Sequence, residues 1–269
     1  MANEREETYL FVDGGYLSKI FDGFTENWYG VRGSLNFHPL RRSYDSVKSF
    51  YYDCLNDLPI GAETPAQVEA RVEVQEIYFD TVRQPRGSHV KLGSLTGSRK
   101  RRRQKQVDIM LAVDMLSHAA NKNMRRAILL AGDQDFIPVV EALVQLGLFV
   151  EVAGEPRSTS RDLRAAADGF RPIKLKEIIG WTKEPLRSTK DVLGEQFNLP
   201  AFSPTLERYG HIGEVKLHTF VAEEDNQFYA RIIGSEMSNV PLFVSDPDES
   251  KVLLYVELQY GPILWDDKV

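Results

Sequence analysis

The segment Leu129-Leu130-Ala131-Gly132-Asp133-Gln134-Asp135-Phe136 decides the fold. Residues 127–131 form an apolar run typical of a buried parallel strand, and residues 136–146 continue with helical spacing. In an open α/β sheet, ligands bind just beyond the carboxyl ends of the strands. The turn therefore carries two carboxylates, Asp133 and Asp135, to an expected site.

The same turn has a purely structural interpretation. Asp135 is a favourable N-cap for a helix that begins at Phe136, and Pro138 is tolerated in the first turn of that helix. Capping needs one acid and leaves Asp133 unexplained. The turn alone does not distinguish a capping role from a catalytic role, so the choice depends on whether other acids are expected at the same place.

A second apolar run ends in an acid in the same way. Residues 9–12 are β-type and are followed by Asp13-Gly14-Gly15, which places Asp13 at the carboxyl end of a strand expected near the centre of the sheet. Taken alone, Asp13 is most simply a turn or cap residue. Two strand-end aspartates in one α/β chain favour a shared site.

A helix expected over 107–121 adds a third acid. At 100° per residue, several apolar side chains lie within about 80° of Asp108, which puts this acid in the middle of the apolar face. These side chains are Leu111, Ala112, Met115, Leu116 and Ala119. An N-cap remains the alternative for Asp108. Asp114 falls on the polar side, where a surface role or a supporting role near the site is expected.

The rest of the first 182 residues predicts alternating elements. Asp80 is a minor site candidate, and Asp168 is expected to end a helix or to bond neighbouring backbone. The expected elements are a loop at 22–42, helices at 44–58 and 65–73, a strand at 76–81, a long basic connection at 83–106, a strand at 149–153, a helix opened by Ser158-Thr159-Ser160, and a strand at 170–175. This β-α alternation with apolar strands predicts a doubly wound, mainly parallel sheet flanked by helices.

The charge distribution is uneven. The 269 residues carry a net charge of −6, yet no acid lies between Asp80 and Asp108, where nine Lys and Arg residues occur. A basic segment on an acidic body indicates a local role, and we expect it to hold a phosphate backbone. The expected contacts are Arg99, Lys100, Arg101, Arg102, Arg103 and Lys105.

The last third of the chain differs in character. We expect a linker at 183–214 and a small antiparallel β appendage at 215–269, with strands at 216–222, 228–233, 241–245 and 251–258. From Ser203 onward there are twelve Asp and Glu residues against five Lys and Arg residues. Because this region should repel nucleic acid, a protein partner or self-association is the better expectation for it.

Composition limits the cellular compartments in which the protein is expected. Cys54 is the single cysteine, which excludes an internal disulfide and a cysteine-rich zinc site. The charged N-terminal residues lack the apolar core of a signal peptide, and no apolar run approaches the ~20 residues that span a bilayer. We therefore expect a cytoplasmic protein with no membrane association.

The acids Asp13, Asp108, Asp133 and Asp135 are predicted to meet at one edge of the sheet. Mutual repulsion would raise their pKa values unless a counter-charge is present. Oxygen ligands without His or Cys suit Mg²⁺ or Mn²⁺ better than zinc. The chemistry that fits is metal-assisted phosphodiester hydrolysis, in which the metal lowers the pKa of a bound water.

Three segments, 11–17, 105–114 and 130–138, together resemble the NYN domain, in its LabA-like branch, of the PIN-like nuclease superfamily. The resemblance covers residues 9–175 and implies a PIN-like fold, divalent-metal dependence and endonuclease activity, most often on RNA. It carries the acidic site over to Asp13, Asp108, Asp133 and Asp135, with Asp114 as a weaker match. Tyr16 stands where many members have Asn, and Ala131 where many have Ser, which could alter water or substrate positioning without removing the metal site.

Two other functions compete with a metal-dependent ribonuclease. One is a catalytically silent nucleic-acid-binding or scaffold protein that retains the PIN-like fold. The other is a phosphotransfer enzyme or phosphatase with an aspartyl nucleophile. Such enzymes commonly need a second acid two positions after the first-strand aspartate, where this chain has Gly15. That class ranks last.

Overall fold

The computed structural model describes residues 7–29, 32–96, 103–105, 107–173, 175–183, 203–234 and 241–266. They form two compact units, the first made of residues 7–23 and 35–171 and the second of residues 24–34 and 172–266. Each unit has its own sheet. None of the described helices is both long and apolar enough to cross a membrane.

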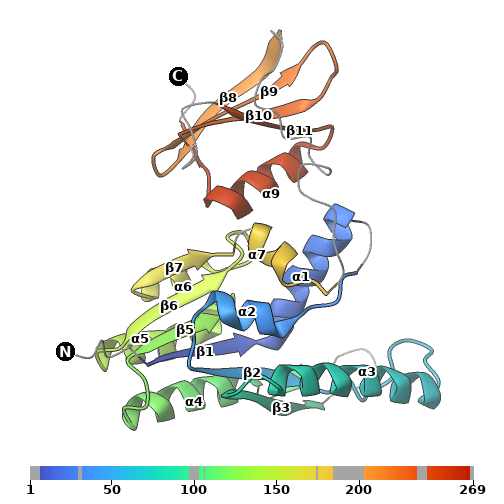
Figure 1. Cartoon of the computed structure of the whole chain (residues 1–269), viewed down its shortest axis with the longest axis vertical. Helices are drawn as coiled ribbons and strands as arrows, with labels where there is room; N and C mark the ends of the chain where they lie inside the picture. The colour runs from blue at the N-terminus through green and yellow to red at the C-terminus, as the bar shows by residue number, and fades with distance from the viewer. Residues whose placement is uncertain are drawn as a thin grey trace. The chain divides into compact units, whose positions relative to one another are not determined.

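The described part of the first unit is built on a seven-stranded sheet in the order β4-β3-β2-β1-β5-β6-β7 (Figure 1). Its strands are β1 (Thr8–Asp13), β2 (Lys48–Cys54), β3 (Ser88–Thr96), β4 (Arg103–Lys105), β5 (Arg126–Leu130), β6 (Phe149–Gly154) and β7 (Gly169–Pro172). Strands β3, β2, β1, β5 and β6 pair in parallel, and β4 is antiparallel to β3. The expected doubly wound, mainly parallel sheet with β1 at its centre is confirmed.

Helices cover both faces of this sheet. They are α1 (Gly14–Tyr29), α2 (Phe37–Ser43), α3 (Pro65–Arg83), α4 (Val107–Ala120), the short 3₁₀ helix η1 (Gln134–Phe136), α5 (Ile137–Gln145) and α6 (Arg161–Ala166). Along β1, Tyr9 and Phe11 belong to the core cluster that includes α4 and α5. On the adjacent strand β2, the ring of Tyr51 contacts Phe37 of α2 and Phe79 of α3. Alternate residues of the central strands thus pack against different helix layers.

The predicted helix at 44–58 is wrong, because residues 48–54 form strand β2. Ser49, Phe50, Tyr51 and Tyr52 are buried in succession. A strand that is buried on both faces shows no alternation of apolar and polar residues. Its apolar residues therefore matched helical spacing by coincidence.

Three further predictions in this region are wrong. The expected loop at 22–42 contains the end of α1 and most of α2, and Leu17, Phe21 and Phe24 supply α1 with a buried stripe at helical spacing. The helix expected at 65–73 is confirmed but continues to Arg83 as α3, so the strand expected at 76–81 is wrong; α3 starts at a capping box of Thr64 and Gln67. The connection at 83–106 contains β3 and β4.

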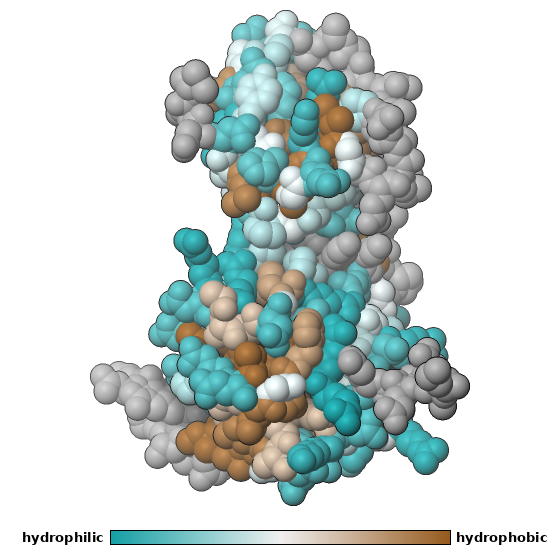
Figure 2. Space-filling view, turned by 90° about the vertical axis from the view of Figure 1, so that its left-hand side faces the viewer, coloured by the Kyte–Doolittle hydropathy of each residue, from teal (hydrophilic) through white to brown (hydrophobic). Residues whose placement is uncertain are grey.

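Helix α4, by contrast, closely matches its prediction and is apolar on two sides. Leu111 and Met115 are fully buried, whereas Ile109 and Val113 are exposed. Figure 2 shows hydrophobic side chains gathered on one face of the protein surface. Because apolar residues lie on both the buried and the exposed side of α4, periodicity identified the helix but did not define closely which side faces the core.

The second unit contains a five-stranded antiparallel sheet in its described residues, in the order β11-β10-β9-β8-β12. The strands are β8 (Pro204–Ile212), β9 (Val215–Ala222), β10 (Phe228–Ile233), β11 (Leu242–Asp246) and β12 (Leu264–Trp265), and the helices are α7 (Leu175–Gly180) and α9 (Glu249–Tyr260). The expected antiparallel β region is confirmed.

Two details of the second unit differ from expectation. Residues 204–212, assigned to a linker, form β8; residues 184–202 of that linker lie outside the described part of the chain. The expected strand at 251–258 is helix α9, which Asp248 caps by accepting a hydrogen bond from the Ser250 N–H at 2.9 Å. Val252, Tyr255 and Val256 are buried at helical spacing, so tertiary burial favoured a helix over the β-prone composition.

Candidate active site

Asp13 is the last residue of the central strand β1, and α1 begins at the next residue. The backbone N–H of Tyr16 in the first turn of α1 donates to Asp13 Oδ1 at 3.0 Å. Burial raises the pKa of Asp13 to about 6, and the negative charges of Asp108 and Asp53 add to this effect, while the Tyr16 N–H opposes it. Asp13 is thus a carboxyl group held in place at a position that disfavours its charge.

Asp133 follows β5, the strand on the other side of β1. Its side chain accepts a hydrogen bond from the Asp135 N–H at 3.1 Å and caps η1. The cap is therefore Asp133, whereas capping was expected of Asp135. Successive strands proceed from β1 toward β2 in one direction and from β5 toward β6 in the other, so Asp13 and Asp133 flank the switch point where ligands bind in such sheets.

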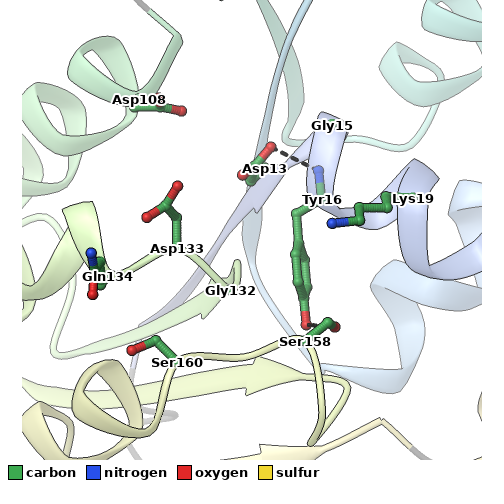
Figure 3. A pocket seen from close by; sticks show the side chains of 10 residues that line it. All are labelled: Asp13, Gly15, Tyr16, Lys19, Asp108, Gly132, Asp133, Gln134, Ser158 and Ser160. Carbon is green, nitrogen blue, oxygen red and sulfur yellow. Dashed lines mark hydrogen bonds between the residues drawn. The ribbon is translucent and has the colours of Figure 1, made fainter.

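Asp108 is the second residue of α4 and its side chain is exposed, not directed into the core. Its pKa is raised by partial burial first and then by the charges of Asp133 and Asp135. Figure 3 shows the carboxylates of Asp13, Asp108 and Asp133 around one opening. The structure therefore brings together three of the four predicted site acids, while exposed Asp135 acts on Asp108 from outside the pocket lining.

The pocket has a volume of about 510 Å³. One part of its wall is acidic and another part is polar or basic. The lining residues are Asp13, Gly15, Tyr16, Lys19, Asp108, Gly132, Asp133, Gln134, Ser158 and Ser160. They come from the end of β1, from α1 and α4, from the turn after β5 and from the loop after β6, so the cavity exists only in the folded sheet.

Tyr16 connects these elements. Its hydroxyl lies 2.8 Å from Thr159 Oγ1 and 3.2 Å from Ser158 Oγ, and it accepts a hydrogen bond from the Glu155 N–H at 2.9 Å. Burial raises the pKa of Tyr16, which keeps the phenol protonated. A Cβ atom on Gly132 would overlap the Tyr16 ring. Tyr16 thus packs the pocket wall.

The acids can be tested for a fit to a divalent cation. Among the described residues, Asp13, Asp108 and Asp133 have no ion-pair partner, and Lys91 pairs with Asp114 instead. In the described part of the chain, no group of three His, Cys, Asp or Glu side chains is arranged to hold a metal ion. Mg²⁺ usually keeps several water ligands and takes one or two carboxylates plus substrate phosphates. The uncompensated acids fit such a hydrated ion.

Asp53 is a partly buried acid near this site that sequence reasoning missed. It follows the buried run of β2, and burial raises its pKa to about 6, against the opposing hydrogen bonds from the Cys54 N–H and the Tyr51 hydroxyl. Its charge also contributes to the raised pKa of Asp13. An apolar run ending in an acid was the available signal, and the wrong assignment of residues 44–58 to a helix concealed it.

The remaining candidate residues lie elsewhere or are not described in full. Asp114 accepts a hydrogen bond from the Tyr52 hydroxyl at 2.7 Å and pairs with Lys91 at 2.6 Å. Asp80 pairs with Arg83 on α3, and the Val150 N–H donates to Asp168, the backbone role expected of that acid. Of the expected nucleic-acid contacts, Arg99, Lys100, Arg101 and Arg102 lie outside the described residues; Arg103 and Lys105 belong to β4, where their backbones pair with Thr96 and Ser94.

A doubly wound sheet with acids at its switch point defines an α/β protein with a candidate ligand site at that point. The chain belongs to the NYN domain family of PIN-like nucleases, since the NYN domain model matches residues 8–174. No curated protein matches the chain. Among solved structures it is similar to a protein of unknown function from Vibrio parahaemolyticus, at 21% identity and a TM-score of 0.43, covering 64% of this chain and 95% of that one.

Proposed function

We propose that this protein is a divalent-metal-dependent nuclease that hydrolyses phosphodiester bonds in RNA. The observation that carries the proposal is the convergence of Asp13, Asp108 and Asp133 on one pocket, where none of them forms an ion pair with a described residue. Membership of a family of PIN-like nucleases supports the same reaction class. RNA is preferred over DNA because the NYN resemblance implies RNA most often.

In this proposal Asp13, Asp108 and Asp133 would hold a hydrated Mg²⁺ or Mn²⁺, in part through its water ligands, and Asp135 adds negative potential next to Asp108. When bound, the ion would supply an activated water and stabilise charge on the phosphate oxygens. The Tyr16 N–H fixes Asp13 through its hydrogen bond, and the Asp135 N–H fixes Asp133. Residues 99–105 hold the RNA backbone through their cations.

The direct test uses labelled RNA and DNA of the same sequence, each with Mn²⁺ or with a chelator. We expect wild type to cleave RNA with Mn²⁺ only, and Asp133→Asn to lose at least about 99% of kcat because a neutral side chain binds the ion weakly. Asparagine can still accept the Asp135 N–H, so the cap should survive. Asp80→Asn, an exposed acid on α3, is the matched control and should cleave normally.

The alternative, a silent nucleic-acid-binding protein, is decided by the same samples. It requires RNA binding that persists in Asp133→Asn and no metal-dependent cleavage by wild type. Cleavage that is equal in wild type and Asp133→Asn, or that is insensitive to chelator, would contradict the nuclease proposal.

The second unit has a proposed role of its own in protein contact or self-association. Its excess of acids, twelve against five Lys and Arg from Ser203 onward, disfavours contact with RNA. Light scattering of the full chain over a range of concentrations distinguishes self-association from a role that needs another partner.

A further inference from the structure

The acidic pocket has a basic side. Lys19 lies on α1, three residues after Tyr16, and its exposed side chain lines the pocket. Figure 3 shows its ammonium group directed toward Tyr16, across the opening from Asp108. The hydroxyl-bearing residues Ser158 and Ser160 line the same cavity.

The ammonium group of Lys19 does not form an ion pair with any described residue, although three carboxylates line the same pocket. Lys91, in contrast, is held 2.6 Å from Asp114. An ammonium group that lines an acidic cavity without pairing with its acids leaves room for an anion between them.

The serine side of the pocket is held in place by hydrogen bonds. The carboxylate of Glu155 accepts from the Ser158 N–H at 2.6 Å and from the Arg157 N–H at 2.9 Å. The Ser160 N–H donates to the carbonyl of Gly132 at 2.9 Å, which attaches this loop to the turn that carries Asp133. The hydroxyls have partners of their own: Ser158 Oγ lies 3.2 Å from the Tyr16 hydroxyl, and Ser160 Oγ accepts from the Leu163 N–H at 3.4 Å. Backbone and side-chain bonds together give the two hydroxyls a defined position relative to the acids, as recognition of a small anion requires.

We propose that Lys19, together with the hydroxyls of Ser158 and Ser160, binds the phosphate group that is hydrolysed, on the side opposite the metal-holding acids. This inference rests on the proposed nuclease function. A phosphodiester shares one negative charge between two non-bridging oxygens. Surrounding it with carboxylates alone would repel it, whereas an ion on one oxygen and an ammonium group on the other would hold and orient it.

The first test measures RNA binding in the Asp133→Asn protein with Mg²⁺, so that the RNA stays intact. Adding Lys19→Gln is expected to weaken binding about tenfold and to reduce the slope of log Kd against log salt by about 1, since one phosphate contact is lost. Adding Lys19→Arg should restore the slope. Adding Lys122→Gln, which removes an exposed charge outside the pocket, should leave affinity near its starting value.

The second test uses the otherwise unchanged protein and inorganic phosphate as an inhibitor of cleavage. Lys19→Gln should raise the inhibition constant about tenfold and lower kcat/KM by at least that factor. Because Lys19 is exposed, its variants should fold like wild type, which circular dichroism checks.

The outcomes separate this inference from the nuclease proposal. If wild type cleaves RNA while Lys19→Gln keeps the same kcat/KM, phosphate inhibition and salt slope, the phosphate subsite is wrong and the nuclease stands. If wild type does not cleave but Lys19→Gln still lowers affinity and slope, the subsite stands and the nuclease proposal fails. Equal effects of Lys19→Gln and Lys122→Gln would indicate general charge attraction and would overturn the subsite.

Discussion

At the scale of single residues, the site is dominated by acids that are costly to ionise. Asp13 ends β1, and Asp53 follows the residue that is paired with it on β2. The pKa values of Asp13 and Asp53 are each raised to about 6, and burial is the largest cause in both cases. A bound cation would favour their ionised forms, so metal-free protein should show the full effect of burial.

The stability of metal-free protein is therefore predicted to depend on pH in a particular direction. A carboxyl group whose folded pKa is about 6, against 3.8 for the ordinary group, binds its proton more tightly when folded. Its contribution is fully present below pH 4 and is lost as the pH rises through 6. For Asp53 the difference of about two pKa units corresponds to about 3 kcal/mol as an upper value.

Asp53→Asn tests this directly. With chelator present, we expect the variant to unfold at higher urea than wild type at pH 8, by about 1–3 kcal/mol in free energy of unfolding, and to match wild type at pH 4. Asp57→Asn, an exposed acid nearby, is the control and should not change the pH profile. A loss of stability at pH 8 in Asp53→Asn would show that the ionised carboxylate stabilises the fold.

Asp114, unlike Asp53, has a cationic partner among the described residues, Lys91. Asp114→Asn removes the ion pair with Lys91 but can still accept from the Tyr52 hydroxyl. We expect a loss of about 1 kcal/mol in free energy of unfolding, because the pair is partly exposed, and no change in kcat/KM. Urea unfolding and RNA cleavage measured on the same sample distinguish this role from a direct one in the pocket.

At the scale of elements, the turn after β5 depends on close packing between α1 and the loop after β6. A Cβ atom on Gly132 would lie 2.5 Å from the carbonyl oxygen of Ser158 and would overlap the Tyr16 ring. The glycine therefore lets Tyr16 reach the loop that carries Ser158. The position of Asp133 depends on the same contact, since it follows Gly132 directly.

Gly132→Ala is predicted to lower the free energy of unfolding by about 3 kcal/mol and to reduce cleavage, because either Tyr16 or the backbone of Ser158 must move. Gly23→Ala is the matched control. Gly23 lies in α1, and no atom is within 4 Å of the position that an added methyl group would take, so alanine should stabilise the helix by about 0.5–1 kcal/mol. Similar unfolding curves for the two variants would contradict the proposed packing constraint.

Tyr16→Phe tests the hydroxyl of the same contact. The change leaves the Glu155 N–H without its acceptor and removes the contacts with Ser158 and Thr159. We expect a loss of about 1–3 kcal/mol in stability. If Ser158 helps to bind phosphate, the inhibition constant of inorganic phosphate should also rise, a result that a purely structural role of Tyr16 would not produce in protein that is still fully folded.

At the scale of the whole molecule, charge is divided between a basic segment and an acidic remainder. The net charge is −6 although nine cations occur between Asp80 and Asp108. Contact with RNA should therefore depend on a short stretch of sequence, not on the average surface. Its salt dependence reports how many phosphates that stretch contacts.

Replacing residues 99–103 by glutamine should weaken RNA binding strongly and reduce its salt slope by about 3.5, the value for losing five contacts to a single strand. The control removes five cations from other parts of the chain: Arg42, Lys122, Arg125, Lys216 and Lys251. Fluorescence anisotropy at several salt concentrations compares the two proteins at equal net charge. An equal decrease in both would show that net charge, not this segment, governs binding.

Local sequence was sufficient where strands and helices had strong and unambiguous patterns. Strands β1 and β5 and helices α4 and α5 lie close to where apolar runs and periodicity predicted them. It was insufficient where tertiary burial changes the pattern. Residues 49–52 are buried on both faces of the sheet, and α9 is buried on one stripe of a β-prone sequence.

The sequence by itself determined the doubly wound sheet and the meeting of Asp13 and Asp133, because strand-end acids at a switch point converge by topology alone. Asp108 was predicted from helical spacing and reaches the pocket from the start of α4. Only the tertiary structure decided that Asp53 is partly buried near them and that Asp133 is the cap. It also decided that Tyr16, Lys19 and Ser158 share the same pocket. These features depend on contacts between residues as far as 142 positions apart, and no local pattern of residues encodes such contacts.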